Sequence, residues 1–218
     1  FSAASQQSTF VELLQPYILD GRLHSLPARV IKALVKHFET ENRLQEVERC
    51  ILHLNPRDMD LDSLVKLCRS HHLYDALIYI FNRGLMDYVT PLEDLLGKMK
   101  LTETPERAAG GGNGQDDQHS QHVKALLYLS YTLSGHAYPT GELNEATATS
   151  ARSLLVQYLS SSTAYDVVNT SSSQETSQKT YPVVLHLLRK DTQETLSLLE
   201  IVFSDTAVGT SGTNTNRS

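Results

Sequence analysis

The chain has 218 residues, enough for one or two domains, and 40% of them are apolar. Its net charge is −6 with neither sign in a block, which argues against a nucleic-acid-binding protein, because such proteins carry a basic stripe. The longest wholly apolar run, Ala76–Phe81, is far shorter than the roughly 20 residues of a membrane-spanning helix. Two cysteines do not make a disulfide framework, so we expect a reducing compartment. The chain starts at Phe1 instead of methionine, and we expect it to be part of a longer protein.

The first part of the chain reads as short helices joined by brief turns. One helix is expected over about 10–19, with Thr9 and Glu12 spaced as its capping box and Gly21 marking its end. A second starts near position 27, and a third runs over about 42–54 before the pair Asn55–Pro56 stops it. Their apolar residues fall at helical spacing: Val30, Ile31, Leu34, Val35 and Phe38 in the second helix, and Leu44, Val47, Ile51 and Leu54 in the third.

The stretch 60–99 is the most regular part of the sequence. Asp60 can cap a helix whose apolar residues share one stripe. The following run, Leu73–Phe81, is apolar at all but one position, so it must be covered on several sides. A third helix is expected to start at Thr90, whose hydroxyl can cap it. Pro91 follows at the first helical position, and Glu93 is spaced to complete a capping box.

A weak internal repeat supports a stacked arrangement of these helices. Leu34-Val35-Lys36 recurs as Leu64-Val65-Lys66 at an offset of 30, and the helices that follow share apolar spacing at an offset of 29. Helix-pair repeats have about this length. We therefore predict an all-α fold, an α-solenoid of antiparallel helical hairpins of the clathrin or tetratricopeptide type. Such an architecture holds partners and spaces them.

The second half of the chain alternates helical patterns with polar tracts. Helices are expected to begin near Val123, Asn144, Pro182 and Thr192, the last behind Asp191. No segment shows a strand pattern with hairpin turns. We divide the chain into hairpin repeats over 1–101, a flexible linker over 102–120, further solenoid helices over 121–203 with a mobile loop at 161–179, and a disordered tail over 204–218.

The block Leu67–Leu96, LCRSHHLYDALIYIFNRGLMDYVTPLEDLL, resembles the central region of the vacuolar protein sorting-associated protein eight family. The preceding ERCILHL at 48–54 fits the same family, and so does DTQETL at 191–196, which leads into Phe203. The resemblance is specific over about half of the chain.

The resemblance implies a role in membrane traffic. Members of this family have an N-terminal β-propeller, a long α-solenoid and a C-terminal RING finger, and this chain would be solenoid only. The family is the membrane-tethering subunit of the CORVET complex. The resemblance therefore implies a cytoplasmic protein, peripheral on early endosomes, acting in early endosome fusion and endosome-to-vacuole or lysosome transport. Implied partners are the other CORVET subunits and, through the full-length protein, an early-endosomal Rab GTPase.

Two Cys-x-x-His pairs have the residue types of a zinc site. Cys50 precedes His53 and Cys68 precedes His71, each pair on one helical face. However, Cys68 falls in line with apolar neighbours, where a small buried residue is expected. We predict core packing for the cysteines, with no metal and no cofactor.

No pattern for catalysis stands out. The sequence has neither a Gly-x-Ser-x-Gly elbow nor a His-Glu-x-x-His pair, and the glycine-rich run at 110–114 lacks the Gly-Lys-Ser/Thr ending of a phosphate loop. We predict that the chain is not an enzyme and assign no catalytic residue.

Four residues are candidates for a partner interface: Tyr74, Tyr79, Arg83 and Tyr88. Tyrosine and arginine are enriched where proteins meet. The alternative for the tyrosines is packing within the chain. Arg83 could instead bond to the last carbonyls of its own helix, and we favour this capping role.

Two other functions compete with the tether. One is a tetratricopeptide-like adaptor that binds peptides and belongs to no tether. A basic clamp or an asparagine ladder along one helix face would favour it, and neither is visible in the sequence. The other is an independent enzyme regulator.

Overall fold

The computed structural model describes residues 3–101, 114–161 and 181–209. This part of the chain is all-α: it forms ten α-helices, and its single β-type contact is an isolated bridge between His136 and Glu142. The predicted fold class is confirmed. The helices divide into two compact units, Phe1–Pro91 and Leu92–Ser218. Within the described ranges no helix has the length and apolar character of a bilayer span.

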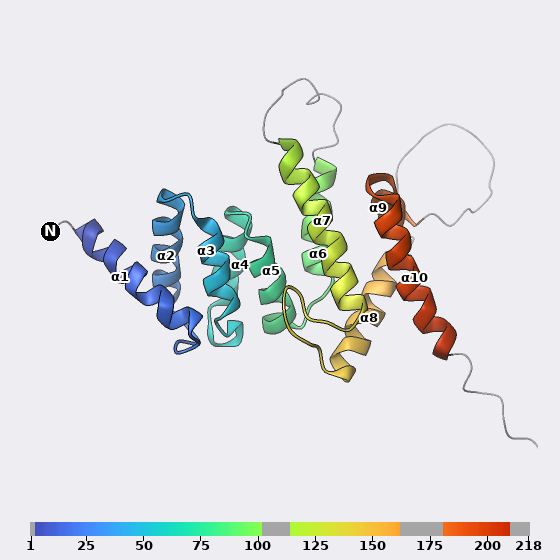
Figure 1. The fold of residues 1–218 in the computed structure, drawn as a ribbon, viewed down its shortest axis with the longest axis horizontal. Helices are drawn as coiled ribbons and strands as arrows, with labels where there is room; N and C mark the ends of the chain where they lie inside the picture. Colours follow the sequence, from blue (N-terminus) through green and yellow to red (C-terminus); the bar gives the residue numbers. More distant parts are fainter. Residues whose placement is uncertain (1–2, 102–113, 162–180, 210–218) are drawn as a thin grey trace, which may run out of the picture. The chain divides into compact units, whose positions relative to one another are not determined.

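The first unit is a row of short helices, which Figure 1 shows following one another in chain order from blue to green. Helix α2 packs against α1 and α3, α4 packs against α5 and α2, and α3 packs against α5. The elements are α1 Ala3–Leu19, α2 Ala28–Thr40, α3 Leu44–Leu52, the 3-10 turn η1 Pro56–Asp58, α4 Leu61–Ser70, α5 Tyr74–Ile80 and the π-helical turn η2 Phe81–Leu85.

The core of the first unit is made of the stripes that the spacing predicts. Helices α2, α3 and α4 each bury one face and keep the other in water, while α5 is buried at most positions because it is apolar almost all round. The buried residues of α2 are Ile31, Leu34, Val35 and Phe38, and those of α4 are Leu64, Val65 and Cys68.

One turn recurs between the two helices of a pair, between α2 and α3 and between α4 and α5. Asn42 (φ 56°) and His72 (φ 57°), an interval of 30 residues, are both left-handed. In each turn the next amide donates to the carbonyl five positions earlier, at 2.7 Å for Arg43 and 2.9 Å for Leu73. This is the Schellman ending, which satisfies carbonyls that a helix leaves free. The predicted repeat therefore extends to the backbone of the turns. The same turn follows α1 at Gly21 and the helix that ends at Leu133 at Gly135.

Two predicted capping boxes are wrong. Helix α1 begins at Ala3, so Thr9 lies inside it, because the alanine-containing start continues the helix upstream. At the start of α6, Asp87 takes the place of the predicted cap Thr90. It accepts hydrogen bonds from the amides of Val89 and Thr90 at 2.9 and 3.0 Å, and the Thr90 hydroxyl donates to it at 2.6 Å. By contrast, the predicted caps Asp60 and Asp191 are confirmed by bonds to the amides three residues later.

The second unit has longer helices and closes on itself. Helix α7 packs against α8, α8 against α9, α9 against α10, and α10 returns to α7. Its helices are α6 Thr90–Leu101, of which the first residues belong to the first unit, α7 Gly114–Leu133, α8 Glu145–Ser160, α9 Pro182–Lys190 and α10 Thr192–Gly209.

Three tracts predicted to lack structure meet the described ranges only in part. Residues 114–120 of the predicted linker belong to α7, and residues 204–209 of the predicted tail belong to α10. The rest of the linker, the loop from residue 162 onward and the end of the tail lie outside the described residues.

Candidate functional site

A pocket of about 380 Å³ opens in the first unit, where the end of α3, η1 and the end of α5 meet. Its volume lies within the range of small-ligand sites, roughly 300–1,000 Å³. Its residues come from the α1–α2 connection, from the segment that follows α3, and from α5 and η2. They are His24, His53, Leu54, Asn55, Pro56, Arg57, Tyr79 and Arg83.

The turn at Asn55, where the helical pattern ends, forms one wall of the pocket. Pro56 ends the helical pattern, and the Asn55 amide donates to the carbonyl of His24 at 2.6 Å. The Asn55 side chain accepts from the Arg57 amide at 3.3 Å and donates to Asp58 at 2.6 Å. These bonds hold the segment after α3 against the α1–α2 connection, and the neighbouring Arg57 bonds to Arg83 in η2.

Tyr79 ties the opposite wall to this segment. Its hydroxyl donates to the carbonyl of Leu54 at 2.9 Å. Burial raises the pKa of Tyr79, although the nearby guanidinium of Arg83 opposes the shift. The hydroxyl is therefore neutral at physiological pH and keeps its proton for the carbonyl.

Two guanidinium groups face the pocket. Arg57 Nε donates to the carbonyl of Arg83 at 3.0 Å, and its Nη2 lies 3.6 Å from the sulfur of Met86. The favoured capping role of Arg83 stays a prediction; the carbonyl of Arg83 itself accepts from Arg57. The Arg83 side chain lines the pocket beside the Tyr79 hydroxyl.

The pocket has a positive lining in an acidic chain. Two arginines and two histidines line it, and no carboxylate is among its described residues. Within the described ranges, neither Arg57 nor Arg83 forms an ion pair. His53 Nδ1 lies 2.8 Å from the Arg49 carbonyl, which can only accept, so Nδ1 carries the proton.

The structure separates the four candidate interface residues. Tyr79 and Arg83 line the pocket together, whereas Tyr74 and Tyr88 are only 6% and 3% exposed. Sequence reasoning missed His24, His53 and Arg57, because no helical period connects positions so far apart. The sequence signal that could have identified Arg57 was the pair Asn55–Pro56, which ends the helix and places Arg57 on a turn.

The cysteines lie in the core, as predicted. Cys50 in α3 and Cys68 in α4 are each 1% exposed. Burial raises the pKa of Cys50 to about 11 and that of Cys68 to about 12, so both are neutral thiols at physiological pH.

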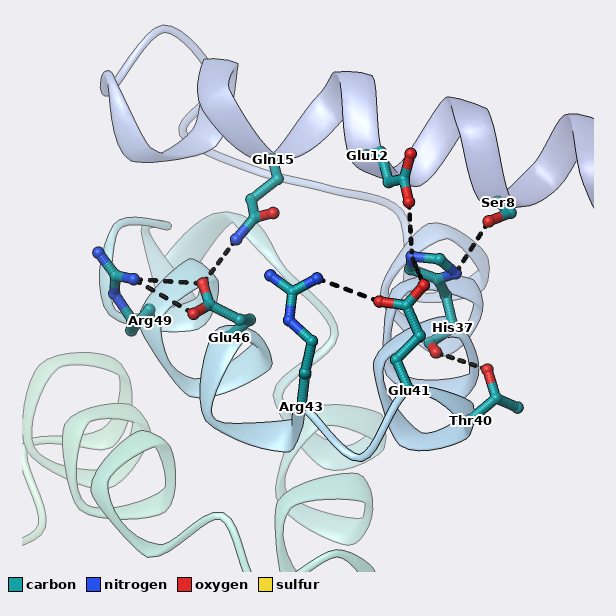
Figure 2. Close-up of polar contacts among 9 residues, drawn as sticks. All are labelled: Ser8, Glu12, Gln15, His37, Thr40, Glu41, Arg43, Glu46 and Arg49. Carbon is teal, nitrogen blue, oxygen red and sulfur yellow. Dashed lines mark hydrogen bonds and ion pairs between the residues drawn. The ribbon is translucent and has the colours of Figure 1, made fainter.

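A second polar cluster joins α1 to α2 (Figure 2). The His37 side chain is 8% exposed, and its Nε2 lies 3.9 Å from Glu12 and 3.6 Å from Glu41. His37 Nδ1 lies 3.2 Å from the hydroxyl of Ser8, and Arg43 pairs with Glu41 at 3.1 Å. One ligand atom from each of Glu12, His37 and Glu41 lies within 4.8 Å of the others, so this set could hold a metal ion, although we predicted none. The contacts of Ser8 and Glu12 with His37 join α1 to α2.

A neighbouring contact joins α1 to α3. Gln15 donates from its amide to the carboxylate of Glu46 at 2.7 Å, and Arg49 pairs with the same carboxylate at 3.3 Å (Figure 2). Two separate groups of polar bonds thus connect α1 to the next two helices, one around His37 in α2 and one around Glu46 in α3. These bonds orient α1 on the helices behind it.

Comparison with known proteins identifies the family. The profile described as Vps8 central TPR, a tetratricopeptide-repeat region, matches residues 9–203. The vacuolar protein sorting-associated protein 8 homologs of Mus musculus and Homo sapiens are 33% and 31% identical over 199 residues. Vacuolar protein sorting-associated protein 8 of Saccharomyces cerevisiae is 29% identical over 139 residues. The match covers 91% of this chain and 13% of each mammalian relative, so the chain spans only a small part of their length. The chain belongs to the Vps8 family, as its resemblance implied, and corresponds to the central tetratricopeptide-like region of that family.

Proposed function

We propose that this chain is a structural and interaction segment of a CORVET subunit, which tethers membranes before early endosomes fuse and cargo moves to the vacuole or lysosome. The observation that carries the proposal is the match over 91% of the chain to relatives named for vacuolar protein sorting. The row of helix pairs in the first unit supports it, because such stacks act as spacers with long edges for partners.

The exposed side of α1 supports an interaction role. Phe10, Leu13 and Tyr17 are spaced by three and four residues and are all at least half exposed. In a solenoid, such a stripe is what an adjoining repeat or a partner subunit covers. We propose that the partners are the other CORVET subunits, and that contact with an early-endosomal Rab GTPase is made by the full-length protein. The proposed location is cytoplasmic, peripheral on early endosome membranes.

We propose no catalytic role. The described nucleophile candidates Cys50 and Cys68 are buried thiols with raised pKa values, which makes them poor nucleophiles.

One observation favours a second function, a tetratricopeptide-like adaptor that binds peptides outside any tether. The pocket with Arg57 and Arg83 supplies the basic residues that an adaptor would need and that no helix stripe in the sequence contains. In an adaptor, this pocket would be the main binding site, whereas in a tether it would be one contact among several.

Co-purification with purified sibling CORVET subunits separates the two functions. A tether segment should retain at least one sibling at stoichiometric level, and removing the Phe10–Tyr17 stripe by Phe10→Ser and Leu13→Ser should weaken that retention. Leu185→Ser, at an exposed apolar residue of the second unit, is the matched control. Failure to retain any sibling, together with capture of short peptides, would favour the adaptor.

A further inference from the structure

We propose that the pocket in the first unit binds an anionic oxygen group, a carboxylate or a phosphate, carried by a short segment of a partner protein. The residues that carry the inference are His24, His53, Arg57, Tyr79 and Arg83, here called the anion pocket. The proposal rests on the proposed function in one respect only, that the occupant belongs to a partner subunit.

The two arginines supply the recognition. A guanidinium presents several N–H donors in a planar fork that matches the oxygens of a carboxylate or phosphate. Arg57 and Arg83 line the same pocket and form no ion pair within the described ranges. Two uncompensated like charges in one pocket are unfavourable, and an anion between them would remove the repulsion.

The pocket is fixed before any ligand enters. Arg57 is anchored by its Nε bond to the Arg83 carbonyl, and this bond fixes the orientation of the guanidinium group. Tyr79 is held on the Leu54 carbonyl, and the Asn55 turn is held on the His24 carbonyl. A preformed site loses little side-chain entropy on binding, so even a small anion can be retained.

The negative group nearest in sequence is already engaged. The Asp58 carboxylate accepts from the Asn55 side chain at 2.6 Å and is not part of the pocket lining. Of the residues that line the pocket, His24, His53, Arg57 and Arg83 are all exposed. A ligand can reach them from solvent without moving a helix.

A protein segment suits this pocket better than a membrane or a nucleic acid. Both of those present many negative charges over a wide surface, and the chain as a whole carries a net charge of −6 that repels such surfaces. Here Arg57 and Arg83 line a single pocket of about 380 Å³, which has room for one acidic or phosphorylated side chain and its neighbours.

The inference is tested by calorimetric titration of the 218-residue chain at low salt with inorganic phosphate and with three versions of one short peptide. The peptide carries phosphoserine, glutamate or serine at its centre. We expect saturable binding of phosphate and of at least one anionic peptide, and at least tenfold weaker binding of the serine peptide. Arg83→Gln should weaken binding at least tenfold. Arg29→Gln, which removes an exposed arginine of α2 outside the pocket, should change it less than twofold.

Three outcomes would overturn the inference. They are the absence of saturable binding to every probe, equal weakening by Arg83→Gln and Arg29→Gln, and tighter binding to phosphatidylserine-containing vesicles than to either anionic peptide. Because Arg57 also supports a helix end, Arg57→Gln is interpreted only if its circular dichroism and melting match those of the parent chain. The sibling co-purification is repeated with Arg83→Gln. Retention of siblings without probe binding rejects the anion pocket alone, and probe binding without siblings rejects the tether alone.

Discussion

The two units of the chain stabilise their helices by different patterns of packing. In the first, helices of 7 to 17 residues pack against helices one or two positions away in the chain, and tight turns join the pairs. In the second, α7 and α8 have 20 and 16 residues, and α10 packs back on α7 from far along the chain. The first unit is thus stabilised by neighbours, and the second by closure. A contact between helices that are adjacent in sequence costs little loop-closure entropy. The contact of α10 with α7 closes a longer loop and costs more.

The comparison predicts that damage to the first core stays in the first unit. Phe38→Ala removes a side chain that is fully buried in α2 and should cost about 3–5 kcal/mol. Hydrogen exchange should then accelerate in α1 to α5, with α7 to α10 unchanged. Phe10→Ala, at an exposed position of α1, is the control with an expected cost below about 1 kcal/mol. Equal acceleration in both units would mean that they unfold together.

Closure of the second unit is tested on α9. Leu187→Ala removes a buried side chain and should cost about 2–4 kcal/mol, because the cavity lies where α9 meets its neighbours. Since closure is cooperative, exchange should accelerate in α7, α8 and α10 together. Leu185→Ala on the same helix, 42% exposed, should cost less than about 1 kcal/mol. Acceleration confined to α9 would contradict closure.

Alkaline pH should weaken the first unit, since it contains both cysteines. Their thiols have pKa values of about 11 and 12 in the folded chain and about 9.0 when unfolded. Above pH 9 the unfolded state loses protons first, so stability present below pH 9 falls as pH rises toward the folded values. Each thiol contributes a slope of up to about 1.4 kcal/mol per pH unit in this window.

Urea unfolding followed by hydrogen exchange, at about pH 8.5 and about pH 10, measures this effect. Cys68→Ala should lower the slope of the first unit's free energy of unfolding against pH. A loss of the same size in the second unit would show that the thiols are not its cause.

The shared turn gives the smallest effect and the most direct comparison. Gly21 in the first unit and Gly135 in the second have φ angles of 67° and 87°, where a side chain is strained. A Cβ at Gly21 would meet no atom within 4 Å, so Gly21→Ala should cost about 1 kcal/mol through the backbone alone. Gly135→Ala should cost a similar amount, since its nearest contact is an ordinary 3.8 Å.

Gly97 in α6 is the control for this pair, because it has open space around it and no left-handed backbone. Gly97→Ala should stabilise the chain by up to about 1 kcal/mol. Thermal melting of the three variants compares the signs. A gain in all three would show that the turns tolerate side chains.

Most of the fold could be predicted from the sequence because each helix has its stripe within a few turns. The stripe of α2 and the Asp60 cap are examples of signals contained in under a dozen residues. Capping boxes were less reliable: the Thr9 pattern also fits the middle of a helix, and Asp87 competes with Thr90 as the acceptor for α6.

The candidate site could be predicted only in part. Tyr79 and Arg83 are four residues apart, in α5 and in η2 directly after it, and were predicted together as interface candidates. The other half of the pocket, with His24 and Arg57, is assembled by the turn at Asn55, and its place depends on how three helices pack. Turns place residues by tertiary contacts that leave no period in a sequence.

The paired endings at Asn42 and His72 have a consequence for how this part of the chain can evolve. Because α2 and α4 both end in the same left-handed backbone with the same hydrogen bond, the thirty residues from Arg43 to His72 are bounded by junctions of like geometry. Tandem duplication or deletion of one such block would rejoin the chain at a turn with the same backbone and the same hydrogen bond. The number of helix pairs in the first unit can therefore change in whole steps of thirty residues, each helix keeping the ending that it already has.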